Sequence, residues 1–326
     1  MQPRVDIRVQ CELGHPVNQS QWGVGAAAAL LVGATWTALQ LAPEASDKER
    51  ATVAPSNASA DVRDGFRADL WHLPADDLAG FVAIPEGTFT MGSHPGVDSL
   101  AFDVEWWGEG RVQGIVHLPT YYVARFEVTG AQYRAFIQAS GHTVVDPAAL
   151  RVSPDYPVTN VSWTDAVAYA RWLDQALRAS SGVPEPLTRL LGEGWRVDLL
   201  DEAQWEKAAR GTDARIFPWG SEPRADRAQF RTRGTARVGT FPCPECAYPI
   251  SDLAGNVWEW TRSPYQAYPF TTSDDGAALG AEALWVMRGG SFGDPEQHIR
   301  AANRGGADPG ARRPFIGFRI ALVPGP

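Results

Sequence analysis

The stretch Asp252–Trp260, DLAGNVWEW, constrains the fold of this chain more than any other segment. Its centre, Gly255-Asn256, predicts a tight turn, because both residue types adopt a left-handed backbone easily. Such a turn directs successive backbone carbonyls to one side, and the carboxylates of Asp252 and Glu259 lie at its two ends. Carboxylate and carbonyl oxygens are the ligands that Ca²⁺ prefers. The residues alone leave two interpretations open: a calcium-binding turn, or a structural turn held by buried tryptophans with its acids in solvent.

Composition narrows the class of protein. The chain has 326 residues, which fits one large domain with an appendage. Its 32 glycines, 25 prolines and 13 tryptophans indicate a loop-rich fold stabilised by indoles. A net charge of −9, without a basic stripe interleaved with aromatics, argues against a nucleic-acid partner.

The cysteines are few and their state is open. Cys243 and Cys246 form a Cys-Pro-Glu-Cys pair, and Cys11 lies far from them in the chain. A zinc ribbon needs a second Cys or His pair at suitable spacing, which this chain lacks. A local disulfide, two reduced thiols and a redox-active pair all remain open, and the compartment decides among them.

The N-terminal region contains a long uncharged segment. No Asp, Glu, Lys or Arg lies between Glu12 and Glu44. Residues 21–42 are long enough, as a helix, to cross about 30 Å of hydrocarbon. Arg4 and Arg8 precede the segment, so the positive-inside tendency places the N-terminus in the cytoplasm. A cleaved signal peptide and a buried helix of a soluble protein are the alternatives.

These features predict a single-pass membrane protein whose bulk is periplasmic or extracellular. The predicted parts are a cytoplasmic tail (1–20), a transmembrane helix (21–42), a linker (43–75) and a globular domain (76–326). The bilayer is therefore an expected partner. Small residues at Gly25, Ala29 and Gly33 would let the helix approach other subunits of a membrane complex closely.

The globular part mixes strands and helices without a repeat or a βαβ alternation, which predicts an α+β domain. FVAIPEGTFTMGS, from Phe81, predicts a hairpin of two strands around Pro85-Glu-Gly87. The segment 180–194, with two prolines, is expected to be a loop. Three helices with capping residues are expected: 131–140 after Thr129, 164–179 from Thr164, and 202–210 after the Asp201/Gln204 capping box.

Nine motifs occur in order between Phe81 and Ile320: PEGTFTMGS, FEVTGAQYRAF, PVTNVSWTDAVAYARWL, DEAQWEKAARG, FPWG, DLAGNVWEW, RGGSF, RAANR and GFR. This series closely resembles the formylglycine-generating enzyme family, also called sulfatase-modifying-factor domains. The resemblance covers nearly three quarters of the chain and excludes about the first 70 residues. It implies a C-type-lectin-like α+β fold with little regular secondary structure.

The resemblance also implies a structural calcium site at the opening motif. In the family, the ligands are the equivalents of the Asp252 and Glu259 side chains and the Gly255 and Val257 carbonyls. This chain keeps both carboxylates at the same separation, so Ca²⁺ is expected there. A second family calcium site falls where this chain is shortened, and we do not predict it.

The family's oxidase converts a sulfatase cysteine to formylglycine with two copper-binding cysteines just after the Gly-Gly-Ser-aromatic motif. Those positions correspond here to about Asp294 and Ile299, and neither is a cysteine. Cys243 and Cys246 lie in a different segment. Because Cu(I) prefers soft thiolate ligands, neither copper nor formylglycine generation is expected.

Two further sets of residues invite a functional interpretation. Related iron-dependent sulfoxide synthases use a His-x3-His-x-Glu cluster, and the histidines here never show that spacing. His298, near Asp294 and Glu296, forms the one local cluster worth naming, and a solvated polar loop is the favoured interpretation of it. An arginine series could bind an anion, but buried ion pairs that lock the C-terminal strands are favoured; its members are Arg300, Arg304 and Arg319.

The sequence therefore predicts a membrane-anchored, extracytoplasmic domain without catalytic residues, acting as a binding or accessory subunit of a membrane complex. The alternative is a divergent metal-dependent enzyme of the same fold, of the non-heme iron type.

Overall fold

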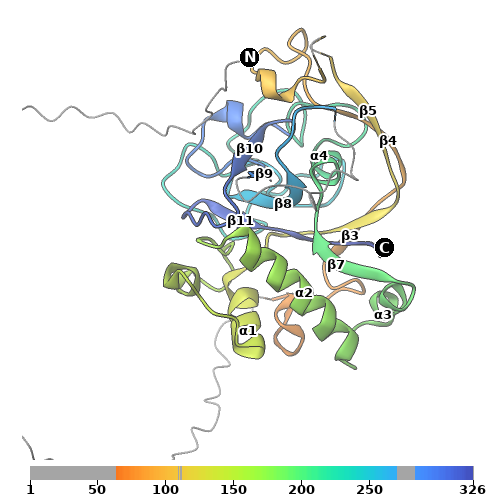
Figure 1. Ribbon diagram of the computed structural model, residues 1–326, viewed down its shortest axis with the longest axis vertical. Coiled ribbons are helices and arrows are strands. Elements are labelled where there is room, and N and C mark those ends of the chain that lie inside the picture. The colour runs from red at the N-terminus through yellow and green to blue at the C-terminus, as the bar shows by residue number, and fades with distance from the viewer. Residues whose placement is uncertain (1–63, 109, 111, 270–282, 326) are drawn as a thin grey trace, which may run out of the picture. The chain divides into compact units, whose positions relative to one another are not determined.

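The computed structural model describes residues 64–108, 110, 112–269 and 283–325 (Figure 1). These residues form two four-stranded sheets and two strand pairs. The first sheet has the order β3 (Phe81–Ile84), β6 (Tyr121–Ala124), β12 (Ile320–Pro324), β7 (Trp195–Leu199). The second sheet has the order β10 (Arg304–Ala307), β9 (Trp285–Arg288), β8 (Trp258–Pro264), β11 (Ile316–Phe318). The pairs are β1 (Phe66–Arg67) with β2 (Leu73–Pro74), and β4 (Gly87–Met91) with β5 (Gly114–Leu118).

Four α-helices accompany these strands: α1 (Gly130–Ser140), α2 (Trp163–Ala179), α3 (Glu185–Gly192) and α4 (Glu202–Arg210). All strand pairings are antiparallel except that of β11 with β8, which is parallel. Much of the described chain lies outside helices and strands. The predicted α+β class with low regular secondary structure is confirmed.

Strand β12 separates two hydrophobic cores. Ile320 and Leu322 point into a first core that includes residues of α1, α2 and α3. Ala321 and Val323 point into a second core that includes Trp205 of α4. Successive side chains of a strand point to opposite faces, so the unbroken apolar run of β12 is explained by burial on both sides. Figure 1 accordingly shows α1 and α2 on one side of this sheet and α4 on the other.

The first helix has the predicted cap and end, and it begins at Gly130, one residue before the predicted start. The Thr129 hydroxyl accepts a hydrogen bond from the Gln132 N–H at 3.3 Å, and the Gln132 side chain accepts one from the Thr129 N–H at 2.8 Å. Gly141 follows in a left-handed conformation with φ 68°. The predicted capping box of α4, between Asp201 and Gln204, is also present. Short-range capping chemistry is therefore sufficient to place both helices.

The cap of α2 differs from the prediction. The helix begins at Trp163, and its N-cap is Ser162 rather than Thr164. Ser162 has an acid three residues ahead, Asp165, which completes a capping box. The residue three positions after Thr164 is Val167, whose side chain cannot accept a hydrogen bond.

Replacing Asp165 with asparagine should reduce stability most near neutral pH. Asp165 accepts hydrogen bonds from His142, Ser162 and Arg312. Burial opposes its ionisation, but these partners hold the pKa of Asp165 below its ordinary value. A lowered folded pKa stabilises the fold above the unfolded pKa, and this contribution is lost as pH falls below about 4.

We expect Asp165→Asn to lose about 1–2 kcal/mol at about pH 7 and less at about pH 3. Urea unfolding of both proteins at the two pH values measures the difference. An equal loss at both would show that the carboxylate charge does not matter.

The segment 180–194 is not simply a loop, because it contains α3. Leu187 and Leu191, four residues apart, bury against the first core. Pro184 sits just before the first turn, where a missing N–H is tolerated. The two prolines therefore mark the start of a helix rather than its absence.

The predicted hairpin of β3 and β4 is wrong. Both strands exist, but β3 pairs with β6 and β4 pairs with β5. The turn between them passes the chain from one sheet to another. Alternation of apolar residues identifies a strand, but it does not identify the partner strand.

The packed domain begins before the predicted boundary at residue 76. Residues 66–74, assigned above to the 43–75 linker, form β1, a 3₁₀ turn (Ala68–Leu70) and β2. Leu70 and Leu73 are buried in the first core. The predicted tail (1–20) and transmembrane helix (21–42) lie outside the described residues. Across residues 64–108, 112–269 and 283–325, no helix is long and apolar enough to cross a membrane.

Candidate functional site

The Asp252–Trp260 turn has the predicted backbone. Gly255 and Asn256 are left-handed, with φ of 75° and 60°. A Cβ on Gly255 would lie 2.2 Å from the Gln229 carbonyl oxygen, so that position accepts glycine alone. The indole N–H of Trp258 donates to Asp294 at 2.9 Å. The turn is therefore held by its neighbours as well as by its own residues.

Glu259, at the start of β8, is buried and ion-paired. It is 1% exposed. Arg319 donates to both of its carboxylate oxygens, with the shortest contact 2.7 Å from Nη2 to Oε1. The indole N–H of Trp205 donates to Oε2 at 2.7 Å. These four contacts match the roughly four acceptor positions of a carboxylate, so Glu259 is fully engaged within the protein.

Asp252 is also buried, at 6% exposure, but only one of its oxygens has a donor. Oδ2 accepts from the Gly239 N–H at 2.7 Å. Oδ1 is enclosed without a hydrogen-bond donor. Burial raises the pKa of Asp252 to about 6. Both acids of this turn are therefore buried. This excludes a structural turn with its acids in solvent, which was one of the two interpretations that the sequence left open.

A third acid, Glu127, lies against this pair and was not singled out from the sequence. It is 1% exposed. Its Oε1 accepts from the Asn256 side chain at 2.9 Å, and its Oε2 has no donor. Burial, and then the charge of Asp252, raise the pKa of Glu127 well above its ordinary range. Glu127 belongs to the FEVT motif, which is too far from Asp252 in the sequence for residue spacing to relate the two acids.

The donor set fits the expected calcium ligation in part. Asp252 offers a buried oxygen that has no hydrogen-bond donor. Glu259 does not fit, because an ion there would have to displace Arg319 or Trp205. The described residues contain no group of three or more His, Cys, Asp or Glu side chains arranged to hold a metal ion. Calcium at this turn stays a prediction.

The loop after the Gly289-Gly290 bend contains the positions that the family uses for copper thiolates. Both glycines are left-handed, with φ of 97° and 71°. Asp294 Oδ2 accepts from the Trp258 indole and from the N–H and hydroxyl of Ser291. Ile299 is fully buried beside Phe217. The hydrogen-bonded Asp294 and the buried Ile299 therefore occupy the positions at which the family has its copper-binding thiols.

The cluster of His298, Asp294 and Glu296 does not converge. Asp294 turns to Trp258 and Ser291, whereas Glu296 pairs with Arg231. The His298 ring stacks on Phe102 at 5.4 Å between ring centroids. Because the three side chains have separate partners, they do not form a facial triad.

Cys243 and Cys246 form a disulfide, with their Cα atoms 5.3 Å apart. Of the three states that the sequence leaves open, the structure has this one.

The arginine series forms buried ion pairs, as expected. Arg300 donates to Asp98 at 2.7 Å and to Glu105, and Arg304 donates to both oxygens of Glu202. Each guanidinium in the series, including Arg319, thus has a carboxylate partner within the domain. Charges that are already paired lock the C-terminal strands to the rest of the fold rather than forming an anion site.

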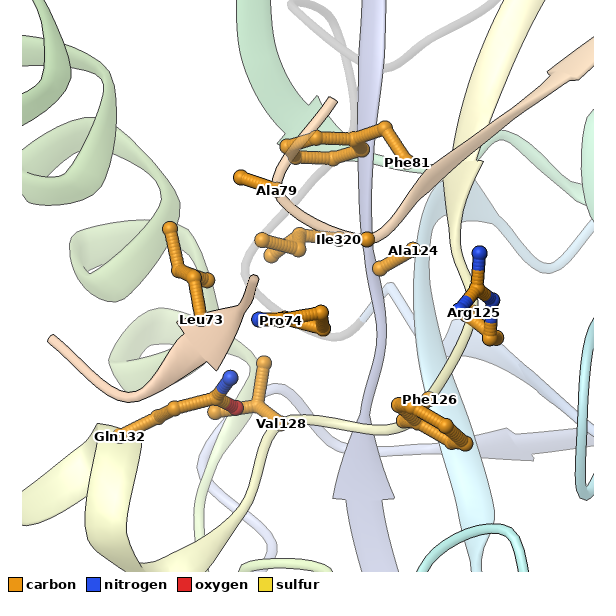
Figure 2. A pocket seen from close by; sticks show the side chains of 11 residues that line it. Leu73, Pro74, Ala79, Phe81, Ala124, Arg125, Phe126, Val128, Gln132 and Ile320 are labelled. Atoms are coloured by element: carbon orange, nitrogen blue, oxygen red, sulfur yellow. The ribbon is translucent and has the colours of Figure 1, made fainter. Parts of the chain in front are cut away.

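A small crevice lies between β2, β3, β6 and β12 (Figure 2). Its wall is mostly apolar, and the polar side chains that line it are Arg125 and Gln132. Gln132 is already used in the α1 cap and donates to the His72 carbonyl, and Arg125 pairs with Asp76. Both polar side chains therefore have partners within the domain, although the Arg125 Nε–H is buried without an acceptor.

Known proteins match both the motif series and the fold of this domain. Residues 68–323 match the family model of the sulfatase-modifying factor enzyme 1-like domain. A formylglycine-generating enzyme of Thermomonospora curvata is 29% identical over 320 residues, covering 77% of this chain and 96% of that enzyme. The inactive C-alpha-formylglycine-generating enzyme 2 of Bos taurus is 30% identical over 188 residues, covering 53% of this chain and 52% of that protein.

Among solved structures, PvdO from Pseudomonas aeruginosa shares the fold. Its TM-score is 0.59 at 26% identity, over 74% of this chain and 93% of that one. Since the family model spans both sheets and both cores of the described domain, the chain belongs to the formylglycine-generating enzyme, or sulfatase-modifying factor, family.

Proposed function

We propose that this protein is a membrane-anchored, extracytoplasmic member of the family that acts as a non-catalytic binding or accessory subunit of a membrane complex. One observation carries the non-catalytic part. Where the oxidases of the family have copper-binding thiols, this chain has Asp294, bonded to Trp258 and Ser291, and the buried Ile299. A carboxylate and an aliphatic side chain cannot supply the soft sulfur ligands that Cu(I) needs.

The proposed location rests on the N-terminal segment and on the disulfide. Residues 21–42 are uncharged and long enough for one span. The Cys243–Cys246 disulfide agrees with an oxidising compartment on the far side of the membrane.

We expect no aldehyde when the purified full-length protein is incubated with copper and a peptide carrying a sulfatase cysteine motif. The readout is labelling of the peptide by an aldehyde-reactive hydroxylamine, followed by mass spectrometry. The Thermomonospora curvata enzyme in the same assay is the positive control. Conversion of the peptide by this protein would overturn the non-catalytic proposal.

Metal analysis separates this proposal from its alternative, a divergent enzyme of the non-heme iron type. Stoichiometric iron in the purified chain would favour the enzyme. Membrane fractionation of the full chain and of a chain lacking residues 1–42 tests the anchor. Recovery of both chains in the soluble fraction would contradict it, and co-purification in mild detergent would identify a partner subunit.

A further inference from the structure

The Cys243–Cys246 disulfide contributes little to the stability of the fold. It joins residues only three positions apart in the sequence. A disulfide stabilises a protein more when it closes a longer loop of the unfolded chain, and this loop is very short. The same turn is also closed by a hydrogen bond from the Cys246 N–H to the Cys243 carbonyl, at 3.2 Å. The bond between the two sulfurs is therefore not needed to form the turn.

Three arginine side chains hold this turn independently of the sulfurs. Arg224 Nη1 and Arg227 Nε donate to the same carboxylate oxygen of Glu245, at 2.8 Å and 2.7 Å. Arg215 Nη1 donates to the backbone carbonyl of Glu245 at 2.8 Å. Glu245 lies between the two cysteines in the sequence, so these contacts keep both cysteines in place. We therefore expect the two sulfurs to stay close when the disulfide is open, which a pair that opens and closes repeatedly requires.

The same contacts set the charge beside the sulfurs. A carboxylate next to a thiol opposes formation of the thiolate, which is the reactive form of cysteine. The hydrogen bond from Arg227 is the largest of the effects that hold the pKa of Glu245 below its ordinary value. Asp226 pairs with both Arg224 and Arg227, so the two arginines and the two acids are neutral together. The negative charge of Glu245 is therefore balanced at the turn.

The disulfide lies at a surface of uncharged side chains. Both cysteines are partly exposed. The exposed residues next to them in the sequence are small or cyclic and carry no charge: Pro242, Pro244, Ala247 and Pro249. The one charged side chain of this stretch, Glu245, is bonded to its arginines. Because thiol–disulfide exchange needs a thiolate to reach a sulfur, such an accessible and uncharged surface suits the approach of another protein.

We propose that Cys243 and Cys246 form a redox-active pair that exchanges its disulfide with the dithiol of a partner protein. A thiolate of the partner attacks one sulfur of the pair, the bond between the two sulfurs breaks, and a mixed disulfide forms. The other cysteine leaves as a thiolate and takes up a proton. The second thiolate of the partner then displaces the bound cysteine, so the pair gains two electrons and the partner is oxidised to a disulfide. This activity adds to the proposed accessory role and depends neither on the membrane anchor nor on the missing copper thiols.

A redox titration of the folded protein tests the proposal. The full chain in detergent, carrying Cys11→Ser to remove the third thiol, is equilibrated with graded ratios of reduced and oxidised glutathione. A parallel series uses a purified dithiol protein of the thioredoxin type. Acid quenching, labelling with a maleimide mass tag and mass spectrometry then count the free thiols, and near-ultraviolet circular dichroism reports whether the domain stays folded.

We expect both thiols to appear together in both series, without loss of the dichroism signal of the folded domain. A disulfide that resists both reagents until urea unfolds the chain would overturn the proposal. Reduction by glutathione but not by the dithiol protein would contradict a protein partner. The double variant Cys243→Ser/Cys246→Ser should melt close to the parent chain, because the turn is held by other contacts. A large fall in its melting temperature would assign the disulfide a structural role instead.

Two substitutions change the charge beside the sulfurs in opposite directions. Glu245→Gln leaves the arginines in excess, so it should favour the thiolates and shift the titration several-fold toward the reduced pair. Arg227→Met should shift it toward the disulfide. The matched controls are Glu185→Gln and Arg189→Met, which make the same kinds of change in an exposed ion pair of α3 and should leave the titration unchanged. Identical midpoints in Glu245→Gln, Arg227→Met and the parent chain would contradict the role given to the arginines.

Discussion

Replacing Arg319 with methionine should destabilise the domain by about 3–5 kcal/mol, because it leaves the Glu259 carboxylate buried without its cation. Arg319 and Glu259 are both at most 1% exposed. Arg319 also donates to the carbonyls of Ala124 and Ser251, at 2.9 Å each. A single side chain thus ties the junction of β11 and β12 to the end of β6 and to the loop before β8.

Equilibrium urea unfolding of wild type and Arg319→Met measures the loss. Arg189→Met is the matched control, because Arg189 pairs with Glu185 on the exposed side of α3, with the two side chains 63% and 70% exposed. Surface pairs contribute little, so this variant should unfold like wild type. Adding Glu259→Gln to Arg319→Met should recover part of the loss. An Arg319→Met protein as stable as the control would show that the pair is unimportant.

Replacing Glu202 with glutamine should destabilise the domain by about 3 kcal/mol, since Arg304 would lose the carboxylate that balances it. Arg304 donates to Glu202 at 2.6 Å from Nε and at 2.8 Å from Nη2. Tyr268 donates to the same carboxylate at 3.1 Å, and its ring lies 3.9 Å from the Arg304 guanidinium carbon. The pair connects α4 to β10.

Glu185→Gln on α3 provides the same chemical change at a site exposed to solvent, and we expect no measurable effect there. The comparison is best made at low and high salt. Screening acts on exposed charges and hardly on buried ones, so the loss in Glu202→Gln should not depend on salt. A loss that disappears at high salt would place the pair in contact with water.

Sequence-level prediction succeeded where the chemistry is local. The caps of α1 and α4, and the left-handed Gly255-Asn256 turn, depend on residues within a few positions of one another. It failed at the predicted β3–β4 hairpin, because β3 pairs with β6. It also missed α3, because this helix depends on the burial of two of its leucines in the first core. The motif series sufficed for the family because it is an ordered pattern over most of the chain.

The residues of the candidate site could likewise be predicted only where they are close to one another in the sequence. Asp252 and Glu259 could be chosen from one motif, whereas Glu127 could not, because its contact with them exists only after β6, β8 and β12 have assembled. The arginines were recognised as ion-pair formers, but their carboxylate partners are up to 202 residues away in sequence.

The order of residues alone therefore decided the family, the turn backbone, the caps of α1 and α4 and the absence of thiols beyond the Gly-Gly bend, since each is a pattern along the chain or a relation between neighbouring residues. Only the tertiary structure decided which carboxylate pairs with which arginine. Arg319 could have faced any carboxylate, and its position between β11 and β12 assigns it to Glu259, leaving Asp252 and Glu127 facing each other. Electrostatic partnership depends on distance and burial, which a linear pattern does not contain.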